Sequence, residues 1–408
     1  MTSAVEPVPW QQPIASAPHD IWDVLIVGAG PAGSIAALHL AARGHRVLLL
    51  DKQRFPRDKT CGDVLIADAL GALQRAGLLE AALQLGYQTE HGSVFSPSRI
   101  EYPVRGRYLT LKRRLLDALI ARKAVEAGAV FCHGEAKSLA VASDGLIACS
   151  LGESGPVYRA RVGVIATGAN VDLLRKLGLT VCLKASGLAV RCYVRSISGF
   201  ERLVASCDRS IVPGYAWIFP MGHQEYNVGC GIVYRGNGRD RTNLRAMFRK
   251  FSAGFPLAQA LLRGAQAISS LRGAFLRCGL KGVLPSGENH ILAIGEAIGA
   301  TFPSTGEGIG KAMETAELAA EVIHDALRSG DLSRLRRFST RLEERLRFRY
   351  LGYEIAERGL SKPWLHDLVA RRARTSRFLQ ESIAGIINET IDPRTVYSWR
   401  GILQSFWK

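Results

Sequence analysis

Residues 23–51 read DVLIVGAGPAGSIAALHLAARGHRVLLLD, and this stretch decides the fold. It begins with a short apolar run, Val24 to Val27, of the kind that forms a buried parallel strand. Gly28, Gly30 and Gly33 follow in the pattern G-x-G-x-x-G, ahead of a small, apolar, helix-forming segment. A second apolar run then ends in an aspartate. The stretch therefore predicts a strand, a tight glycine turn, a helix and a second strand.

Each part of this unit suits the binding of a dinucleotide. Gly28 makes the tight turn, Gly30 lets the backbone approach a pyrophosphate, and Gly33 lets the helix pack on the strand. The helix N-terminus carries roughly half a positive charge directed at the phosphates, and Asp51 can accept hydrogen bonds from ribose hydroxyls. We therefore predict a nucleotide-binding α/β fold rather than a ligand-free turn or a membrane span, which the glycines and Pro31 disfavour.

The chain is strongly basic, with a net charge of +17 over 408 residues. The excess is dense in residues 331–380, which hold 13 Arg or Lys against 6 Asp or Glu. Two explanations stay open: an ordinary solvated helical surface, or a face for an anionic membrane surface, an acidic carrier or an anionic substrate. Nucleic acid is not expected as a partner, because no recognisable nucleic-acid-binding module accompanies the charge.

Cysteine usage and the N-terminal residues bear on where the protein works. The eight cysteines show no paired spacing, which indicates reduced thiols, and no C-x-x-C or histidine cluster predicts a metal site. Residues 1–20 contain four prolines and no periodicity, so we expect a disordered tail there. They lack the pattern of a secretory signal. The expected location is cytoplasmic, with peripheral membrane contact through the basic C-terminal helices left open.

The pattern of apolar runs predicts an interrupted nucleotide-binding sheet. Strands of parallel character recur along the chain, and alternating strands of antiparallel character lie between them. We expect a discontinuous nucleotide-binding domain formed by residues 21–85, 106–185 and 280–330. An antiparallel-sheet substrate domain is expected at residues 86–105 and 186–279, and a helical C-terminal region at residues 331–408. No second G-x-G-x-x-G follows a strand, so no separate NAD(P) domain is expected.

The glycine pattern alone does not separate FAD from NAD, but residues 295–316 do. They read GEAIGATFPSTGEGIGKAMETA, which resembles the second FAD signature of the p-hydroxybenzoate hydroxylase-like flavoproteins. The resemblance implies that Gly295 and Glu296, at a strand end, bind the ribityl chain, with Glu296 in place of the usual Asp. It also implies that the turn Pro303 to Gly308 opens a helix whose N-terminus faces the isoalloxazine. Such a helix end stabilises negative charge on a reduced flavin.

Three further motifs resemble the geranylgeranyl reductase family within that group. FPRDKTCGD, residues 55–63, is similar to its F-P-R-x-K-x-C-G segment, and Arg113 with Asp117 fits its R-x-x-[FL]-D helix. GYAWIFPMGHQEYNVGCG, residues 214–231, fits its Y-x-W-x-F-P motif followed by G-x-G. The family resemblance implies an α/β fold with a Rossmann-type FAD-binding domain of the glutathione reductase and p-hydroxybenzoate hydroxylase type, an inserted antiparallel sheet and a helical C-terminal region.

The two resemblances and the glycine turn together imply a set of FAD-binding residues. That set is Gly28, Gly30, Ala32, Gly33, Asp51, Lys52, Cys61, Gly62, Arg113, Thr167, Gly168, Gly295, Glu296, Gly306, Gly308 and Ile309. Two positions depart from the relatives: Thr60 stands where the family often has Pro, and Thr167-Gly168 stands where related hydroxylases have Asp-Gly. Because the Asp-Gly motif is tied to NAD(P)H handling, the expected electron donor is either NAD(P)H or an external reductase.

Three residues are candidates for catalysis: Cys61, Tyr215 and Trp217. The family places the Cys61 loop beside the flavin and the substrate, although a free cysteine is often a small buried core residue. Tyr215 and Trp217 alternate with Ala216 on a predicted strand and so share one face. That face is either sheet core or an aromatic wall of a pocket for a small apolar substrate.

The family resemblance implies an FAD-dependent reductase of carbon–carbon double bonds in an isoprenoid or similar apolar chain. The alternative is a monooxygenase that hydroxylates or epoxidises an aromatic or prenylated compound, because related folds host different chemistries. A flavin-dependent halogenase is less favoured. Lys59 is similar in position to the halogenase lysine, but the following CGD does not match the halogenase G-E-S loop, and no W-x-W-x-I-P is present.

Overall fold

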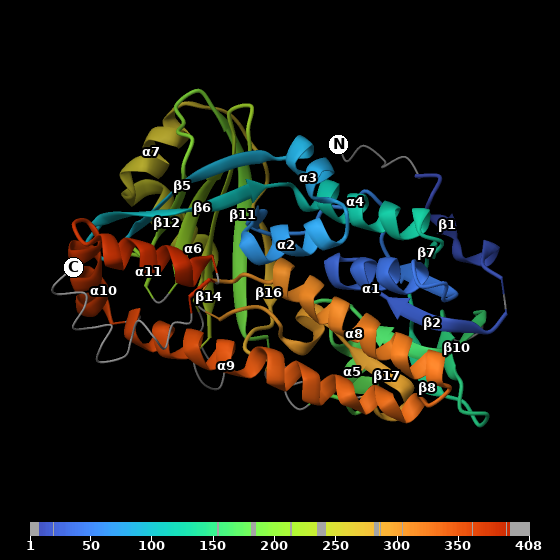
Figure 1. The fold of residues 1–408 in the computed structure, drawn as a ribbon. Helices are drawn as coiled ribbons and strands as arrows, with labels where there is room; N and C mark the ends of the chain where they lie inside the picture. Colours follow the sequence, from blue (N-terminus) through green and yellow to red (C-terminus); the bar gives the residue numbers. More distant parts are fainter. Residues whose placement is uncertain are drawn as a thin grey trace.

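The protein contains two β-sheets with helices packed around and between them, which confirms the predicted α/β class (Figure 1). The computed structural model describes residues 8–18, 20–152, 155–180, 185–212, 214–234, 242–280, 285, 287–303, 305–360, 362–388 and 390–391.

The first sheet has the strand order β1-β7-β3-β2-β10-β9-β8, and β17 also pairs with β10. Its strands are β1 (Gln12–Pro13), β2 (Trp22–Val27), β3 (Val47–Asp51), β7 (Val130–His133), β8 (Ser138–Val141), β9 (Ile147–Ser150), β10 (Val157–Ile165) and β17 (Ile291–Ala293). The central strands run parallel, and Val27 pairs with both Leu50 and Ile165. The carboxyl ends of β2, β3 and β10 therefore meet at one edge of the sheet, where ligands bind in such folds.

Three helices pack together beside this sheet: α1 (Pro31–Ala41), α4 (Arg113–Glu126) and α8 (Ile309–Ser329). Helix α1 contacts both of the others, and all of its residues except His39 are buried. This burial on every side explains why its sequence is small and apolar with little amphipathic pattern. The glycine turn before α1 is thus held by a rigid, fully packed element.

The N-terminal residues correct one expectation from the sequence. Trp10 stacks on Phe131 with ring centroids 5.9 Å apart, and the Gln11 amide donates to the Gln53 carbonyl at 2.8 Å. Strand β1 pairs in parallel with β7. The predicted disordered tail is therefore wrong for residues 8–18, because aromatic packing and strand pairing order them. Residues 1–7 and 19 lie outside the described residues.

The second sheet has the strand order β15-β11-β14-β13-β12-β5-β6-β4, and β16 also pairs with β11. Its strands are β4 (Val64–Leu65), β5 (Tyr87–Phe95), β6 (Glu101–Thr110), β11 (Gly187–Ser196), β12 (Leu203–Ser206), β13 (Tyr215–Pro220), β14 (Glu225–Val233), β15 (Ala265–Ile268) and β16 (Arg272–Leu276). Only the pair β12 and β5 is parallel among these described strands. Strand β6 continues in this sheet to Thr110, past the expected boundary at residue 105, because it pairs with β5 along its length.

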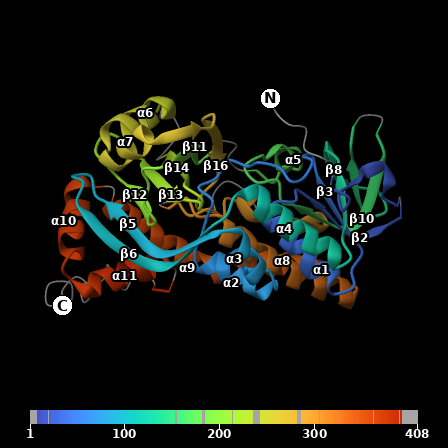
Figure 2. The same ribbon diagram turned by 90° about the horizontal axis from the view of Figure 1, so that it is seen from above.

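Helices cover both faces of the second sheet (Figure 2). On one face, α6 (Leu244–Gly254) and α7 (Pro256–Arg263) share a core with β11, β13 and β14. On the other, α10 (Pro363–Ala373) and α11 (Arg377–Ile387) pack on β6. The long helix α9 (Arg337–Leu360) runs from α8 to α10 (Figure 1).

Short elements complete the described chain. They are α2 (Ala67–Arg75), α3 (Leu79–Leu85), α5 (Asp172–Lys176) and the 3₁₀ turns η1 (Ile14–Ser16), η2 (Glu288–His290), η3 (Gly295–Ile298) and η4 (Leu332–Arg336). No helix in the described part of the chain combines the length and apolar character needed to cross a bilayer.

Candidate active site

A cavity of about 1070 Å³ begins at the ligand-binding edge of the first sheet, passes the inner face of the second sheet and reaches α10 and α11. Most of the residues predicted to form the site line it: Gly28, Gly30, Ala32, Asp51, Lys52, Cys61, Gly62, Arg113, Thr167, Gly168, Tyr215, Trp217, Glu296, Gly306, Gly308 and Ile309. Gly33 and Gly295 do not line it. Each of these two glycines packs against neighbouring protein atoms instead.

The glycine turn has both the tightness and the open space that the sequence pattern requires. A Cβ at Gly28, where φ is +104°, would overlap the carbonyl oxygen of Ala166, and a Cβ at Gly33 would overlap that of Gly28. At Gly30, by contrast, the nearest atoms are guanidinium nitrogens of Arg57 at 3.7 Å and Arg113 at 3.9 Å. This open, cationic space at the N-terminus of α1 fits a pyrophosphate.

Two arginines from different segments enclose this space. Arg113 forms a two-pronged ion pair with Asp117, at 2.7 and 2.9 Å, and Arg57 Nη1 lies 3.0 Å from the same carboxylate. Burial alone would raise the pKa of Asp117, but the two guanidinium groups outweigh it and hold that pKa below its usual value. Arg57 was absent from the predicted set, although the F-P-R segment that contains it carried the signal.

Asp51 ends β3 beside this space. Its carboxylate accepts hydrogen bonds from the backbone N–H groups of Ala29, at 2.9 Å, and Gln53, at 2.8 Å. Arg57 Nε lies 3.7 Å from it. These contacts fix the carboxylate between the glycine turn and the end of the strand, where it borders the cavity.

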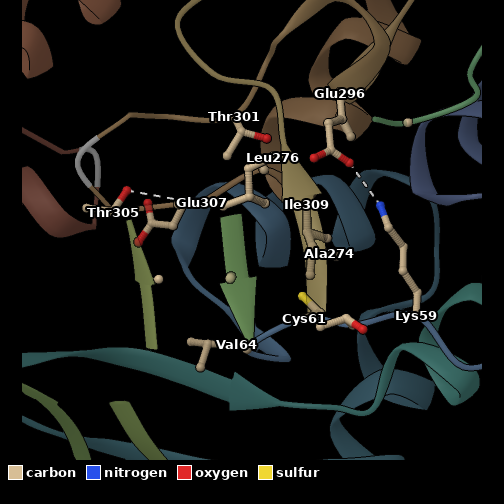
Figure 3. A pocket seen from close by; sticks show the side chains of 18 of the residues that line it. Lys59, Cys61, Val64, Ala274, Leu276, Glu296, Thr301, Thr305, Glu307 and Ile309 are labelled. Carbon is tan, nitrogen blue, oxygen red and sulfur yellow. Dashed lines mark hydrogen bonds and ion pairs between the residues drawn. The ribbon is translucent and has the colours of Figure 1, made fainter. Parts of the chain in front are cut away.

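Glu296 has a partner that the sequence did not indicate. Its Oε2 atom lies 2.9 Å from Nζ of Lys59, and Figure 3 shows the two side chains meeting across the cavity wall. Gly168 lies beside both, because a Cβ there would be 3.4 Å from Glu296 Oε2 and 3.5 Å from Lys59 Nζ. The pair joins the loop after β3 to the segment after β17.

The turn before α8 presents backbone donors to the cavity. Helix α8 begins at Ile309, and its N-cap residue, Gly308, supplies no side-chain cap. The N–H groups of the first helical turn have no intrahelical acceptor, so this end of α8 suits an electron-rich ligand group. The Tyr215 hydroxyl donates to the Thr305 carbonyl at 2.6 Å and ties the turn to β13.

Strand β13 turns its aromatic residues toward the cavity. Tyr215, Trp217 and Phe219 line it, with successive ring centroids 5.6 and 6.1 Å apart, whereas Ala216 and Ile218 belong to the core under α6 and α7. Trp217 is only 4% exposed, and its indole N–H donates to an amide oxygen of β14 at 2.9 Å. Trp217 is therefore both a pocket wall and a packed residue, so the two alternatives from the sequence are not exclusive.

That amide belongs to Asn227, which organises the loop of Cys61. Its Nδ2 atom donates to the Cys61 carbonyl at 2.8 Å and to Asp63 Oδ2 at 2.9 Å. Figure 3 shows the Cys61 sulfur directed into the cavity. Burial, and then the Asp63 carboxylate, raise the pKa of the Cys61 thiol, so Cys61 carries its proton at neutral pH. Asn227 and Asp63 were missed although both lie within the quoted motifs, because a motif does not indicate which side chains meet across two elements.

The far end of the cavity is apolar. Its walls are Ile66, Val94, Tyr102, Val104, Tyr108, Leu203, Val369, Ile383, Ile386 and Ile387. The polar groups of His366 and Tyr102 lie 3.0 Å apart and satisfy each other. Burial lowers the pKa of His366 to about 4, so this histidine is uncharged at neutral pH. The space between β6 and the C-terminal helices is thus lined for an uncharged, apolar group.

Comparison with known proteins agrees with this geometry. The family model described as FAD binding domain matches residues 22–144. A menaquinone reductase of Mycobacterium tuberculosis is 34% identical over 342 residues, covering 78% of this chain and 79% of that protein. Digeranylgeranylglycerophospholipid reductase 1 of Methanopyrus kandleri is 30% identical over 348 residues, covering 82% and 90%. Conditioned medium factor receptor 1 of Dictyostelium discoideum is 32% identical over 336 residues, covering 77% of this chain but only 65% of that protein.

Solved structures share the fold at lower identity. A geranylgeranyl bacteriochlorophyll reductase-like protein of Thermoplasma acidophilum aligns with a TM-score of 0.77 and 21% identity over 95% of this chain and 99% of its own. The halogenase PltM in complex with FAD aligns with a TM-score of 0.70 and 16% identity, covering 95% and 85%. The fold alone thus does not separate the chemistries, whereas the sequence relatives above include two reductases. On this evidence, the chain belongs to the geranylgeranyl reductase family of FAD-dependent oxidoreductases.

Proposed function

We propose that the protein reduces carbon–carbon double bonds in the isoprenoid chain of a lipid, with FAD as the redox cofactor. The observation that carries this proposal is the continuity of the cavity, which joins the cationic glycine turn to an apolar space between β6 and α11. A cofactor at one end and an apolar chain at the other would meet at the Cys61 loop and the β13 aromatic wall. The names of the menaquinone and digeranylgeranylglycerophospholipid reductases support the same class of substrate.

The described residues divide between the two ligands. Gly28, Gly30, Arg57 and Arg113 would hold the pyrophosphate, and Asp51 the adenosine ribose. The segments around 295–296 and 303–309 would hold the ribityl chain and the flavin ring. In this division, the first sheet binds the cofactor and the second sheet, with α10 and α11, encloses the substrate.

The reaction needs a hydride for one carbon and a proton for the other. When bound, reduced FAD supplies the hydride. The Cys61 thiol is positioned to supply the proton, because its sulfur points into the cavity and keeps its proton at neutral pH. Trp217 and Phe219 would hold the chain flat against this loop and exclude water from it.

The electron donor is proposed to be NAD(P)H or an external reductase. Stopped-flow mixing of the oxidised holoprotein with NADPH or NADH, without oxygen, separates these donors. Rapid bleaching of the flavin with either nucleotide identifies a direct donor. Bleaching with dithionite alone identifies a partner reductase.

We also propose that α10 brings the protein to an anionic membrane surface. Trp364 is 65% exposed and Leu368, one helical turn later, is 44% exposed. Arg371 and Arg372 follow in the last turn of the same helix, and Arg374 is its C-cap residue; all three are exposed. Exposed aromatic and aliphatic groups beside arginines suit the interface of an anionic bilayer, and an acidic carrier is the alternative partner.

Flotation with phosphatidylglycerol vesicles tests this contact. The intact protein should float, and reversal of the three arginines to Glu should abolish flotation. Failure of the intact protein to bind these vesicles would reject the membrane contact.

The reductase proposal is tested by anaerobic incubation of the dithionite-reduced holoprotein with digeranylgeranylglycerophospholipid or menaquinone in micelles. We expect a product that gains two hydrogen atoms per reduced bond. Ile383→Trp, which fills the apolar end, should lower conversion at least tenfold and leave the bound FAD unchanged. No hydrogen uptake by either lipid, or full conversion by Ile383→Trp, would contradict the proposal.

A further inference from the structure

A fully buried carboxyl group lies directly behind the Cys61 loop. Asp63 is 0% exposed and has a left-handed backbone, with φ of +64°. Its Oδ2 atom accepts hydrogen bonds from the Tyr193 hydroxyl, at 2.6 Å, and from Asn227, at 2.9 Å. Its Oδ1 atom accepts a longer bond, 3.3 Å, from the backbone N–H of Arg113. The cofactor assignments above do not use this carboxyl.

Tyr193 extends the hydrogen-bonded network of this carboxyl along the cavity-facing side of β11. The residue is partly exposed, on β11, and its ring lies between two cations: Lys112 Nζ at 4.7 Å and the Arg191 guanidinium carbon at 4.2 Å from the ring centroid. These cations keep partners of their own, Glu225 for Lys112 and Asp58 for Arg191. Because the Tyr193 hydroxyl donates directly to Asp63, a proton taken up at this hydroxyl has to cross only one hydrogen bond to reach the carboxyl.

Asp63 lies two residues after Cys61 on the loop that borders the cavity. Cys61 and Asp63 both border the cavity, and Asn227 holds the Cys61 carbonyl and the Asp63 carboxylate at once. The Asp63 carboxylate raises the pKa of the Cys61 thiol and the Arg113 guanidinium lowers it, and these are the two largest effects of charged groups on that pKa. The carboxyl and the thiol are thus two electrostatically coupled proton-holding groups, two residues apart on one short loop.

The pKa of Asp63 is set by burial on one side and by the surrounding donors and cations on the other. Burial raises the pKa of Asp63 to about 6. Hydrogen bonds from Tyr193 and Asn227, together with the positive charges of Arg191 and Arg113, oppose this rise. Asp63 therefore takes up a proton nearer to neutral pH than an ordinary carboxylate does.

We propose that Asp63 and Tyr193 form the route by which a proton from solvent reaches the Cys61 thiol. This inference rests on the proposed reduction. Saturation of one double bond takes two electrons and one proton as hydride from reduced flavin, and a second proton from Cys61 Sγ. The Asp63 carboxylic acid returns a proton to the Cys61 thiolate, and the Asp63 carboxylate is recharged from solvent through the Tyr193 hydroxyl. Asp63 acts through Cys61, so it is a positioning and relay residue rather than one that touches substrate.

The test combines infrared titration with a pH–rate profile. The holoprotein should show a protonated-carboxyl band with a midpoint near pH 6 that is missing in Asp63→Asn. With digeranylgeranylglycerophospholipid in micelles and dithionite as reductant, the rate should fall as pH rises through the same midpoint. Asp63→Asn should be at least tenfold slower and independent of pH in this range.

Tyr193→Phe keeps the proposal falsifiable if Asp63→Asn fails to fold. It removes one donor to the carboxylate, so it should move both the infrared midpoint and the rate midpoint upward together, by roughly one pH unit. It also removes the hydroxyl through which Asp63 is recharged, so turnover should be slower than in the wild type even below the midpoint. Tyr87→Phe, which removes a hydroxyl on the outer surface, should move neither.

Three results would overturn the route: no buried carboxyl that titrates near pH 6, an Asp63→Asn profile like that of the wild type, or a Tyr193→Phe shift in one midpoint only. If the wild type reduces no isoprenoid lipid, the proposed function fails, and the infrared shift in Tyr193→Phe still tests the Tyr193–Asp63 link by itself.

Discussion

The ammonium group of Lys59 lies 2.9 Å from the carboxylate of Glu296, although 237 positions separate the two residues in the sequence. The contact joins the Cys61 loop to the segment proposed to hold the ribityl chain, so one ion pair links two walls of the cavity. It also gives Lys59 a charged partner, which ties this lysine to the segment after β17.

Glu296→Leu should weaken FAD binding about ten- to a hundredfold, because it leaves a ligand hydroxyl and the Lys59 ammonium without an acceptor, at ~1–3 kcal/mol. Titration of the apoprotein with FAD measures this. Lys59→Leu is the matched variant, and the double variant should lose less than the sum of the two. Unchanged affinity in Glu296→Leu would show that Glu296 does not contact the cofactor.

Gly30→Val and Gly33→Val should fail for different reasons. At Gly30 the protein leaves room for a side chain, so Gly30→Val should fold, melt near the wild-type apoprotein and remain colourless. At Gly33 a Cβ overlaps the Gly28 carbonyl, so Gly33→Val should not fold stably. Flavin absorbance beside a thermal melt distinguishes the two. A yellow Gly30→Val protein would refute the assignment of this space to the pyrophosphate.

Trp217→Ala should lower the free energy of unfolding by about 3–5 kcal/mol, because the indole is almost fully buried. Trp217→Phe keeps much of the wall but leaves the Asn227 oxygen without its donor, at ~1–3 kcal/mol. Thermal melts and flavin content measure both effects. If Trp217→Ala melts like the wild type and changes only substrate KM, the packing role assigned to Trp217 is wrong.

The folded protein should become less stable in mild acid, because His366 on α10 is buried and uncharged. Its pKa is about 4 in the folded protein against 6.5 for an ordinary histidine, so the unfolded chain binds the proton first as pH falls. The stability present above pH 6.5 is therefore lost as pH drops toward 4, by about 2 kcal/mol between pH 7 and pH 5. Melting temperatures at these two values measure the loss.

His366→Gln is the control for this pH dependence, because glutamine retains a polar contact for Tyr102 and does not titrate. It should melt with a smaller difference between pH 7 and pH 5 than the wild type. Equal differences in the two proteins would assign the acid sensitivity to other groups.

Local sequence pattern predicted the parts of the site that a single segment builds. The glycine turn and Asp51 lie where the spacing indicates, because strand, turn and helix are fixed by neighbouring residues. The turn before α8 lies where the resemblance to the second FAD signature implies. The period of two along β13 predicted that Tyr215 and Trp217 share one face, and it left open whether that face is sheet core or pocket wall.

The remaining features depend on contacts between distant segments. Asn227 reaches Asp63 from 164 positions away, and Tyr193 reaches it from 130. Nothing in either residue's own neighbourhood marks such a meeting. The dense positive charge of residues 331–380 indicated a solvated helical surface or a face for an anionic partner, yet Val369 and Ile383 of the C-terminal region line the cavity. The role of the C-terminal region depends on which face of each of its helices the second sheet covers.

A single anaerobic turnover tests the central claim most directly. The reduced holoprotein is mixed with an isoprenoid lipid in the absence of oxygen, and flavin absorbance and product mass are followed together. The account predicts that the oxidised flavin spectrum returns as the lipid gains two hydrogen atoms. A flavin that stays reduced until oxygen is admitted, with a product that then gains an oxygen atom, would contradict it and identify a monooxygenase.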